Sequence, residues 1–127
     1  AFPYLKESHG SVINFASGAG ISGKPGQSSY AAAKEGIRGL SRVAANEWGP
    51  YDINVNVVLP LVMTDKLAQW GQENPEMFRK NLDEIPLGRY GDAQKYIGKV
   101  CVFLASYDAK YITGDTLFIQ GGVGMKP

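Results

Sequence analysis

Three short apolar segments, rich in β-branched residues, limit the fold of this chain more than any other feature. They are Ser11–Ser17, Asp52–Pro60 and Thr116–Gln120. The first has a continuous apolar centre, which is typical of a strand buried on both faces of a parallel sheet. Helix-length segments separate the three strands, and the order β-α-β-α-β calls for parallel strands joined by right-handed crossovers. The predicted fold class is therefore α/β, with half of a doubly wound, Rossmann-like sheet.

Two of the connecting segments show helical periodicity. In Ser28–Trp48, apolar residues recur at three- and four-residue steps, serines near position 28 are candidate N-caps, and a Gly-Pro pair ends the helix. Asp92–Ser106 has the same periodicity. Leu61–Gly91 lacks a strong period and predicts one or two short helices in a long segment, whereas the glycine-rich stretch Gly18–Gln27 predicts a loop.

Three strands leave the predicted sheet incomplete. A parallel strand at an open edge has a row of unpaired backbone groups and an uncovered apolar flank. We therefore expect residues 1–127 to pair with further sheet.

The composition excludes several classes of partner. Thirteen basic and twelve acidic residues give a net charge of +1, with no basic stripe for nucleic acid. No apolar run approaches the roughly 18–20 residues needed to span a bilayer. A single cysteine, Cys101, excludes an internal disulfide and a cysteine-based metal cluster. These observations predict a reduced, cytoplasmic protein with no metal site, no nucleic-acid partner and no membrane anchor.

Ser17, Tyr30 and Lys34 form the candidate catalytic set. Tyr30 and Lys34 are four residues apart on the first turns of a predicted helix, so their side chains project from one face. A phenol has a reference pKa of about 10, and a neighbouring ammonium favours the phenolate, so such a pair can serve as a general acid/base. Ser17 ends the preceding strand, and ligands of open α/β sheets bind at the carboxyl ends of strands. A Tyr-x-x-x-Lys pair also arises by chance and a serine at a strand end is often a helix cap, so the hypothesis depends on all three together.

Longer stretches around these residues resemble the short-chain dehydrogenases/reductases. Gly10–Ser17 resembles the strand that delivers the catalytic serine of that family, and Gly26–Lys34 resembles its active-site helix, with the usual thirteen residues from serine to tyrosine. Ile53–Pro60, Pro86–Gly91 and residues 103–122 match further family motifs. The resemblance covers nearly the whole chain. Within the family, the sequence motifs are most similar to those of the 3-oxoacyl-acyl-carrier-protein reductases and glucose dehydrogenases.

The resemblance implies a role for each matching residue. Tyr30 would be the acid/base that protonates the alkoxide formed by hydride transfer, Lys34 would assist it and bind the nicotinamide ribose, and Ser17 would polarise the substrate carbonyl. The cofactor would be NAD or NADP, and the partners would be a small carbonyl or alcohol substrate and further copies of the chain in a homo-oligomer. The segment that cradles the nicotinamide is matched by Pro60, Val62 and Thr64.

The chain departs from the family pattern in several places. Leu61 stands where the family usually has glycine, which predicts an altered backbone approach to the nicotinamide. Gly18–Gly23 spells G-x-G-x-x-G, but it follows the serine strand and precedes a loop, so we do not interpret it as a dinucleotide fingerprint. The family's pyrophosphate turn, its selector of NAD or NADP and its catalytic asparagine have no match, and Ala1–Leu5 resembles the end of the helix that carries the asparagine. We therefore expect residues 1–127 to be the carboxyl-terminal, catalytic half of one Rossmann-like domain whose amino-terminal dinucleotide-binding half is absent.

Two functions from different classes follow. The first is an NAD(P)-dependent oxidoreductase that interconverts an alcohol and a ketone by hydride transfer, inactive as the 127-residue chain alone and completed by the missing amino-terminal half. The alternative is a catalytically silent fragment that acts as an oligomeric or strand-exchanged assembly piece, since an open strand edge invites pairing with another chain. Tight binding of NAD(P)H by residues 1–127 alone would exclude the alternative.

Overall fold

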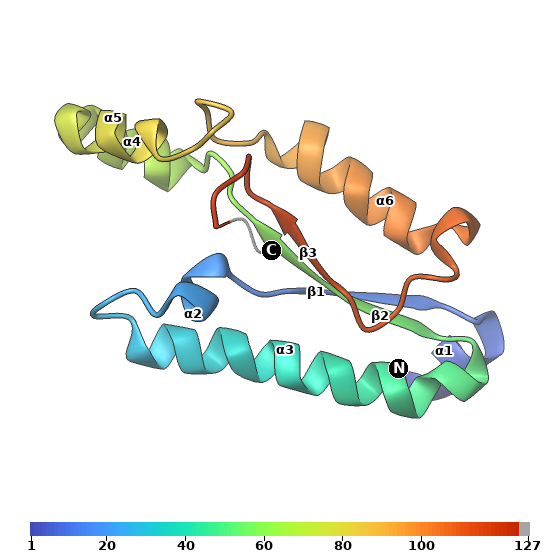
Figure 1. Ribbon diagram of the computed structural model, residues 1–127. Coiled ribbons are helices and arrows are strands. Elements are labelled where there is room, and N and C mark those ends of the chain that lie inside the picture. Colours follow the sequence, from blue (N-terminus) through green and yellow to red (C-terminus); the bar gives the residue numbers. More distant parts are fainter. Residues whose placement is uncertain (125–127) are drawn as a thin grey trace.

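The computed structural model, which describes residues 1–124, contains a three-stranded parallel sheet in the order β1-β2-β3 (Figure 1). Val12 of β1 lies opposite Val55 of β2, and Val58 of β2 lies opposite Leu117 of β3. The α/β class and the parallel strands predicted from the sequence are therefore confirmed. The strands are β1 (Ser11–Phe15), β2 (Asn54–Pro60) and β3 (Thr116–Ile119).

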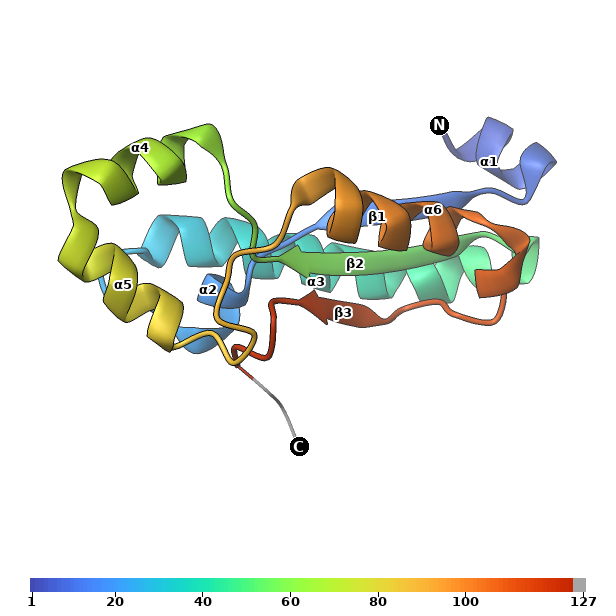
Figure 2. The same ribbon diagram turned by 90° about the horizontal axis from the view of Figure 1, so that it is seen from above.

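Helices cover both faces of the sheet. The long helix α3 (Ser28–Trp48) lies along one face and α6 (Lys99–Ala105) lies along the other (Figure 1). Figure 2 shows that α4 and α5 project beyond the carboxyl ends of β2 and β3, the edge at which open α/β sheets bind ligands. The shorter elements are α1 (Phe2–Ser8), α2 (Gly18–Ser22), η1 (Gly49–Tyr51), α4 (Asp65–Glu73), α5 (Pro75–Asp83), η2 (Ala93–Gly98) and η3 (Tyr107–Ala109).

Strand β2 lies at the centre of the core because both of its faces are covered. On one face Val55 packs with Ala44 and Ala45 of α3, and on the other Val58 packs with Leu104 of α6. All five side chains are buried. This double burial accounts for the nearly continuous apolar run of the strand, which an amphipathic edge strand would not have.

Two buried asparagines interrupt that run and hold the segment before β3. Asn54 donates to the main-chain carbonyls of Lys110 and Ile112 at 2.9 and 3.0 Å. Asn56 donates to the same Ile112 carbonyl at 2.7 Å and accepts a hydrogen bond from the Asp115 N–H at 3.1 Å. These bonds satisfy the Asn54 Nδ2 and both polar atoms of the Asn56 amide, and they fix the approach of β3 to β2.

The strands are shorter than predicted. The first ends at Phe15 rather than Ser17, because the Ser17 side chain caps the helix that follows. The second begins at Asn54 rather than Asp52, because Asp52 has the left-handed φ of 57° that ends the preceding 3₁₀ turn. The third ends at Ile119, one residue before the predicted Gln120.

The helices also differ in detail. Where a loop was predicted over Gly18–Gln27, Gly18–Ser22 forms the short helix α2. Helix α3 has the predicted bounds, but its N-cap is Gln27 and no serine side chain caps it. The predicted helix Asp92–Ser106 is divided into a π-helical turn, η2, and α6.

Candidate active site

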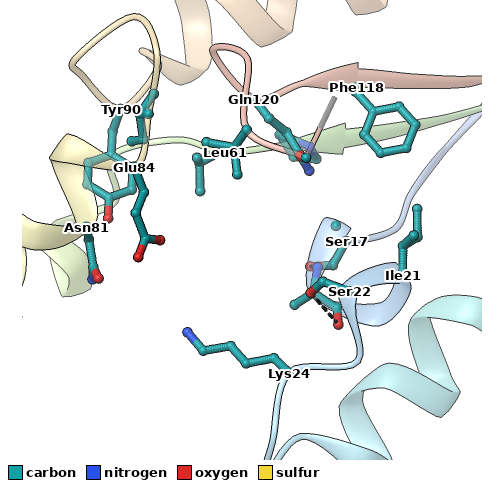
Figure 3. A pocket seen from close by; sticks show the side chains of 16 residues that line it. Ser17, Ile21, Ser22, Lys24, Leu61, Asn81, Glu84, Tyr90, Phe118 and Gln120 are labelled. Carbon is teal, nitrogen blue, oxygen red and sulfur yellow. Dashed lines mark hydrogen bonds between the residues drawn. The ribbon is translucent and has the colours of Figure 1, made fainter. Parts of the chain in front are cut away.

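The carboxyl ends of the three strands meet at one edge of the sheet and form a cleft of about 470 Å³ (Figure 3). Ser17 follows β1, Pro60 ends β2 and Gln120 follows β3, and all three line the cleft. The remaining walls come from α2 and the loop after it, from the residue after β2, from α5 and the segment after it, and from β3 and the turn after it. Their main members are Ile21, Lys24, Leu61, Asn81, Glu84, Ile85, Tyr90, Phe118 and Val123.

Ser17 is held in the cleft by local structure. It has extended backbone geometry and is the N-cap of α2, where its Oγ accepts a hydrogen bond from the Ala19 N–H at 3.2 Å. Capping uses one lone pair of the hydroxyl and leaves its proton free to donate. The side chain is therefore fixed in place while it still offers an O–H to a ligand oxygen.

Tyr30 and Lys34 lie on the first turns of α3, as their spacing predicts. The Lys34 Nζ is 5.8 Å from the centroid of the Tyr30 ring, and it donates to the Phe15 carbonyl at the end of β1 at 3.1 Å. The Tyr30 side chain is 46% exposed. Lys34 thus ties the tyrosine helix to the strand that leads to Ser17, and it keeps two N–H donors for other acceptors.

The structure brings only some of the predicted site residues together. Ser17 and Pro60 line the cleft, whereas Tyr30 and Lys34 lie on α3 outside its walls. Val62 forms an isolated parallel bridge with Gly91. Thr64 is the N-cap of α4, and its Oγ1 accepts from the Leu67 N–H at 3.2 Å.

The residues predicted to contact a nicotinamide have groups that fit one. Within residues 1–124 no hydrogen bond from the Val62 N–H is found, although its neighbours Leu61 and Met63 donate to main-chain carbonyls at 2.9 Å. An unused N–H beside a strand end suits a carboxamide oxygen, and the two free Lys34 donors suit ribose hydroxyls. The segment therefore has the donors that the predicted role requires.

Leu61 adds an apolar side chain to the wall of the cleft, at a position where the resembled family usually has glycine. Its side chain lines the main cleft and also a smaller pocket of about 170 Å³ that it shares with Ile97 and Ile119. Its carbonyl accepts from the Gly91 N–H at 3.0 Å, which fixes the main chain there. The apolar side chain narrows the space at the end of β2.

A basic and aromatic group borders the smaller pocket. Arg89 and Lys95 lie 5.7 and 5.5 Å from the centroid of the Tyr96 ring. A hydrogen bond from Arg89 and the positive charge of Lys95 lower the pKa of the Tyr96 hydroxyl below its usual range. Among residues 1–124, no group of histidine, cysteine, aspartate and glutamate side chains suits a metal ion, and no helix is long and apolar enough to cross a membrane.

Several cleft residues have no counterpart in the sequence prediction. Lys24 comes from a predicted loop, and Asn81, Glu84 and Tyr90 come from the aperiodic segment, so only the folded chain identifies them. Gln120 is different, since it directly follows a predicted strand. The rule that ligands bind at the carboxyl ends of parallel strands could have pointed to it.

Comparisons with known proteins agree on one family. A family model described as enoyl-(acyl carrier protein) reductase matches residues 1–124. A 12alpha-hydroxysteroid dehydrogenase of Clostridium sp. is 61% identical over 126 residues, which are 99% of this chain and 49% of that protein. The 3-oxoacyl-acyl-carrier-protein reductase FabG of Thermotoga maritima is 39% identical over 95% of this chain and 48% of its own length.

A solved structure has the same fold. The crystal structure of Cj0485 dehydrogenase superposes with a TM-score of 0.91 and 34% sequence identity, over 98% of this chain and 50% of that one. The chain thus spans about half the length of each relative named here.

Proposed function

Because the chain belongs to the short-chain dehydrogenase/reductase family, we propose that the protein it forms is an oxidoreductase that interconverts an alcohol and a ketone with NAD or NADP. One observation carries the proposal. Ser17 opens into a cleft at the carboxyl edge of the sheet, and Tyr30 and Lys34 share one face of the adjacent α3. These three are the proposed catalytic residues, and the proposed cofactor contacts are Tyr30, Lys34, Pro60, Val62 and Thr64.

The three proposed catalytic residues have different roles toward one substrate oxygen: proton transfer, hydrogen-bond donation and electrostatic stabilisation. In reduction, the Tyr30 hydroxyl gives its proton to the oxygen as the carbonyl carbon gains a hydride; in oxidation, the Tyr30 phenolate removes the hydroxyl proton. Ser17 donates a hydrogen bond to the same oxygen, because capping α2 leaves its O–H unused. Lys34 places positive charge beside the ring where negative charge develops.

A nicotinamide, when bound, supplies or accepts the hydride. Lys34 would hold its ribose with the two N–H donors that Phe15 does not use, and the Val62 N–H would hold its carboxamide. Pro60 and Thr64 flank that N–H at the end of β2 and the start of α4. NAD and NADP suit these groups equally, since both carry the same nicotinamide ribose.

The substrate that the cleft favours is a steroid-sized alcohol or ketone. The relative with 61% identity is a 12alpha-hydroxysteroid dehydrogenase. A cleft of about 470 Å³ with walls that include Ile21, Leu61 and Ile85 matches the largely apolar sites of roughly 300–1,000 Å³ that hold small molecules. A large apolar ring system would cover these side chains.

Under this proposal, the part of the domain that binds the rest of the dinucleotide belongs to further strands of the sheet, outside residues 1–127. Residues 1–127 would then be the catalytic half of one Rossmann-like domain, inactive alone, in a cytoplasmic homo-oligomer. The open edge at β1 also favours the alternative, a catalytically silent piece that pairs with other chains, because β1 has β2 on one side only within residues 1–124.

Substitution of Tyr30 tests the reaction. In the intact protein, Tyr30→Phe should lower kcat for a 12α-hydroxysteroid about 10²–10⁴-fold, because it removes the general acid/base and little else. Tyr4→Phe, at an exposed tyrosine of α1, is the matched control and should keep full activity. Turnover is followed through the absorbance of the reduced nicotinamide. A Tyr30→Phe protein that keeps most of its activity would rule out the mechanism.

Cofactor titration of residues 1–127 separates the enzyme half from the silent piece. The isolated segment should bind NAD(P)H at least tenfold more weakly than the intact protein and should turn over no steroid. Adding the rest of the sheet as a separate polypeptide should restore both. A mixture that forms a stable complex but has no activity with the steroid or with a 3-oxoacyl thioester favours the silent assembly.

A further inference from the structure

Gln120 is the most enclosed polar side chain of the cleft. It follows β3, it is only 8% exposed, and its carboxamide reaches the first residue of α2, the helix that follows β1. A Cβ placed on Gly18 would lie 2.4 Å from its Nε2 and 3.0 Å from its Oε1. Since β2 lies between β1 and β3, the side chain spans the end of the central strand.

The carboxamide has no protein partner among residues 1–124. None of the side-chain hydrogen bonds found there involves the Gln120 amide, although its carbonyl accepts from the Val123 N–H at 3.2 Å. Buried amides in folded proteins are nearly always hydrogen-bonded. Figure 3 shows the amide directed into the space beside Ser17, where a ligand can reach it.

The backbone that carries Gln120 is held firmly. Gly121 and Gly122 have φ values of 63° and 97°, and a Cβ on either would lie within 3.0 Å of Ile85 or Pro86. The Leu87 N–H donates to the Gly121 carbonyl at 3.1 Å. The glycine pair therefore locks Gln120 to the segment after α5, so its amide is positioned before a ligand arrives.

Two charged side chains of the cleft are more exposed to solvent than Gln120. Lys24 and Glu84 are exposed at the rim, where water can satisfy them. Gln120 is more than nine-tenths buried as a residue, and its amide lines the cleft, where a ligand can hydrogen-bond it.

Gln120 lines the cleft, whereas Tyr30 lies on α3 outside its walls. Gly18 faces the Gln120 amide, whereas Gly20 faces Glu35 and Ala31 of α3. Two residues along a helix rotate the direction by about 200°, so these contacts are on opposite sides. We therefore expect the substrate oxygen that reacts with Tyr30 and the oxygen that meets Gln120 to be different atoms.

We propose that Gln120 is a specificity-determining residue that hydrogen-bonds a second oxygen of the substrate, away from the reacting one. The proposal rests on the proposed function and names its substrate class: an apolar frame with two oxygen functions, one at Ser17 and one at Gln120. A single-oxygen analogue would leave the Gln120 amide unpaired.

The test compares two steroids with two proteins. The probes are a 12α-hydroxysteroid with further ring hydroxyls and one with the 12α-hydroxyl alone. The intact protein should prefer the first at least tenfold in kcat/KM, mainly through KM. Gln120→Met, an apolar side chain of similar length, should remove this preference while the KM for NAD(P)H and the thermal unfolding midpoint stay close to those of the unsubstituted protein.

Calorimetric binding of the same steroids separates the two hypotheses. A binding preference that Gln120→Met abolishes, without turnover, supports the Gln120 contact and rejects the reaction. Turnover with no preference, or a preference that survives in Gln120→Met, overturns the contact and leaves the reaction standing. A protein that neither binds nor turns over either steroid overturns the contact together with the steroid substrate.

Discussion

At the scale of single residues, Ser17 and Gln120 follow two different strands and line the same cleft. Ser17 could be proposed from its place at a strand end and its thirteen-residue distance from Tyr30, and the structure puts it in the cleft. Gln120 follows another strand end, but its importance depends on burial and on contact with Gly18, which lies 102 residues earlier in the chain. Long-range contacts of this kind have no local sequence signal.

Ser17→Ala separates the capping role of the serine from its chemistry. Loss of the cap on α2 should lower the free energy of unfolding by about 0.5–2 kcal/mol, and loss of the O–H should lower kcat about 10²-fold, as with other donors to a developing oxyanion. Asp92→Ala is the matched control, because Asp92 caps η2 by accepting from the Lys95 N–H. It should cost similar stability in chemical denaturation and keep kcat. Equal kcat losses in the two variants would reduce the role of Ser17 to stability.

Cys101 should react slowly with alkylating reagents. Burial raises the pKa of the Cys101 thiol above its ordinary value, so at pH 8 less of it is thiolate than of a free thiol. The rate of modification by iodoacetamide should therefore be lower in the folded protein than in urea, and should keep rising at pH values where a free thiol has levelled off. Mass spectrometry gives both rates. Identical rates in the folded and unfolded protein would contradict this.

At the scale of elements, sequence periodicity predicted the long helix that packs on the sheet. It missed the short helix that is defined by its capping residues. Helix α3 was predicted with its observed bounds because a 21-residue amphipathic face packs on the sheet. Helix α2 was missed because five residues have no readable period; Ser17 at its start and Gly23 in the left-handed region at its end define it instead.

The close packing of α4 against α5 can be tested at Gly71. A Cβ there would lie 2.6 Å from Cδ2 of Phe78, whose ring also lies 5.6 Å from that of Tyr90. Gly71→Ala should therefore destabilise the protein by about 1–3 kcal/mol, in spite of alanine's better helix propensity. Gly98→Ala is the control, since its nearest neighbour would be an ordinary contact at 3.6 Å, and it should be neutral or stabilising. Urea denaturation of both variants gives the comparison; a stabilising Gly71→Ala would show that Phe78 moves freely.

At the scale of the whole molecule, the open edge of the sheet in the described residues is an argument for the proposal that residues 1–127 pair with further sheet. β1 is an edge strand, and Phe15 at its end is 47% exposed. The cleft itself could not be predicted, because its walls come from five separate segments: residues 17–24, 60–61, 81–85, 90 and 118–124. Only the sheet order and the placement of α5 bring them together.

The outer face of α3 leads to the last prediction. Ala33, Gly36, Leu40 and Val43 recur at three- and four-residue steps and are all exposed, Leu40 to 68% and Val43 to 53%. Small residues followed by larger apolar ones on one stripe let two helices approach closely, and a two-fold interface would bring the same stripe from each copy together. We expect this face to form an interface between two copies of the protein.

Leu40→Lys should weaken that assembly. In the intact protein, a lysine at the centre of a self-complementary contact places like charges opposite each other and should raise the dissociation constant at least tenfold. Tyr111→Lys, at a fully exposed loop residue, adds the same charge elsewhere and should leave the assembly unchanged. Sedimentation velocity across a concentration series measures both. If Leu40→Lys sediments like the unsubstituted protein, the stripe on α3 faces solvent and another surface joins the copies.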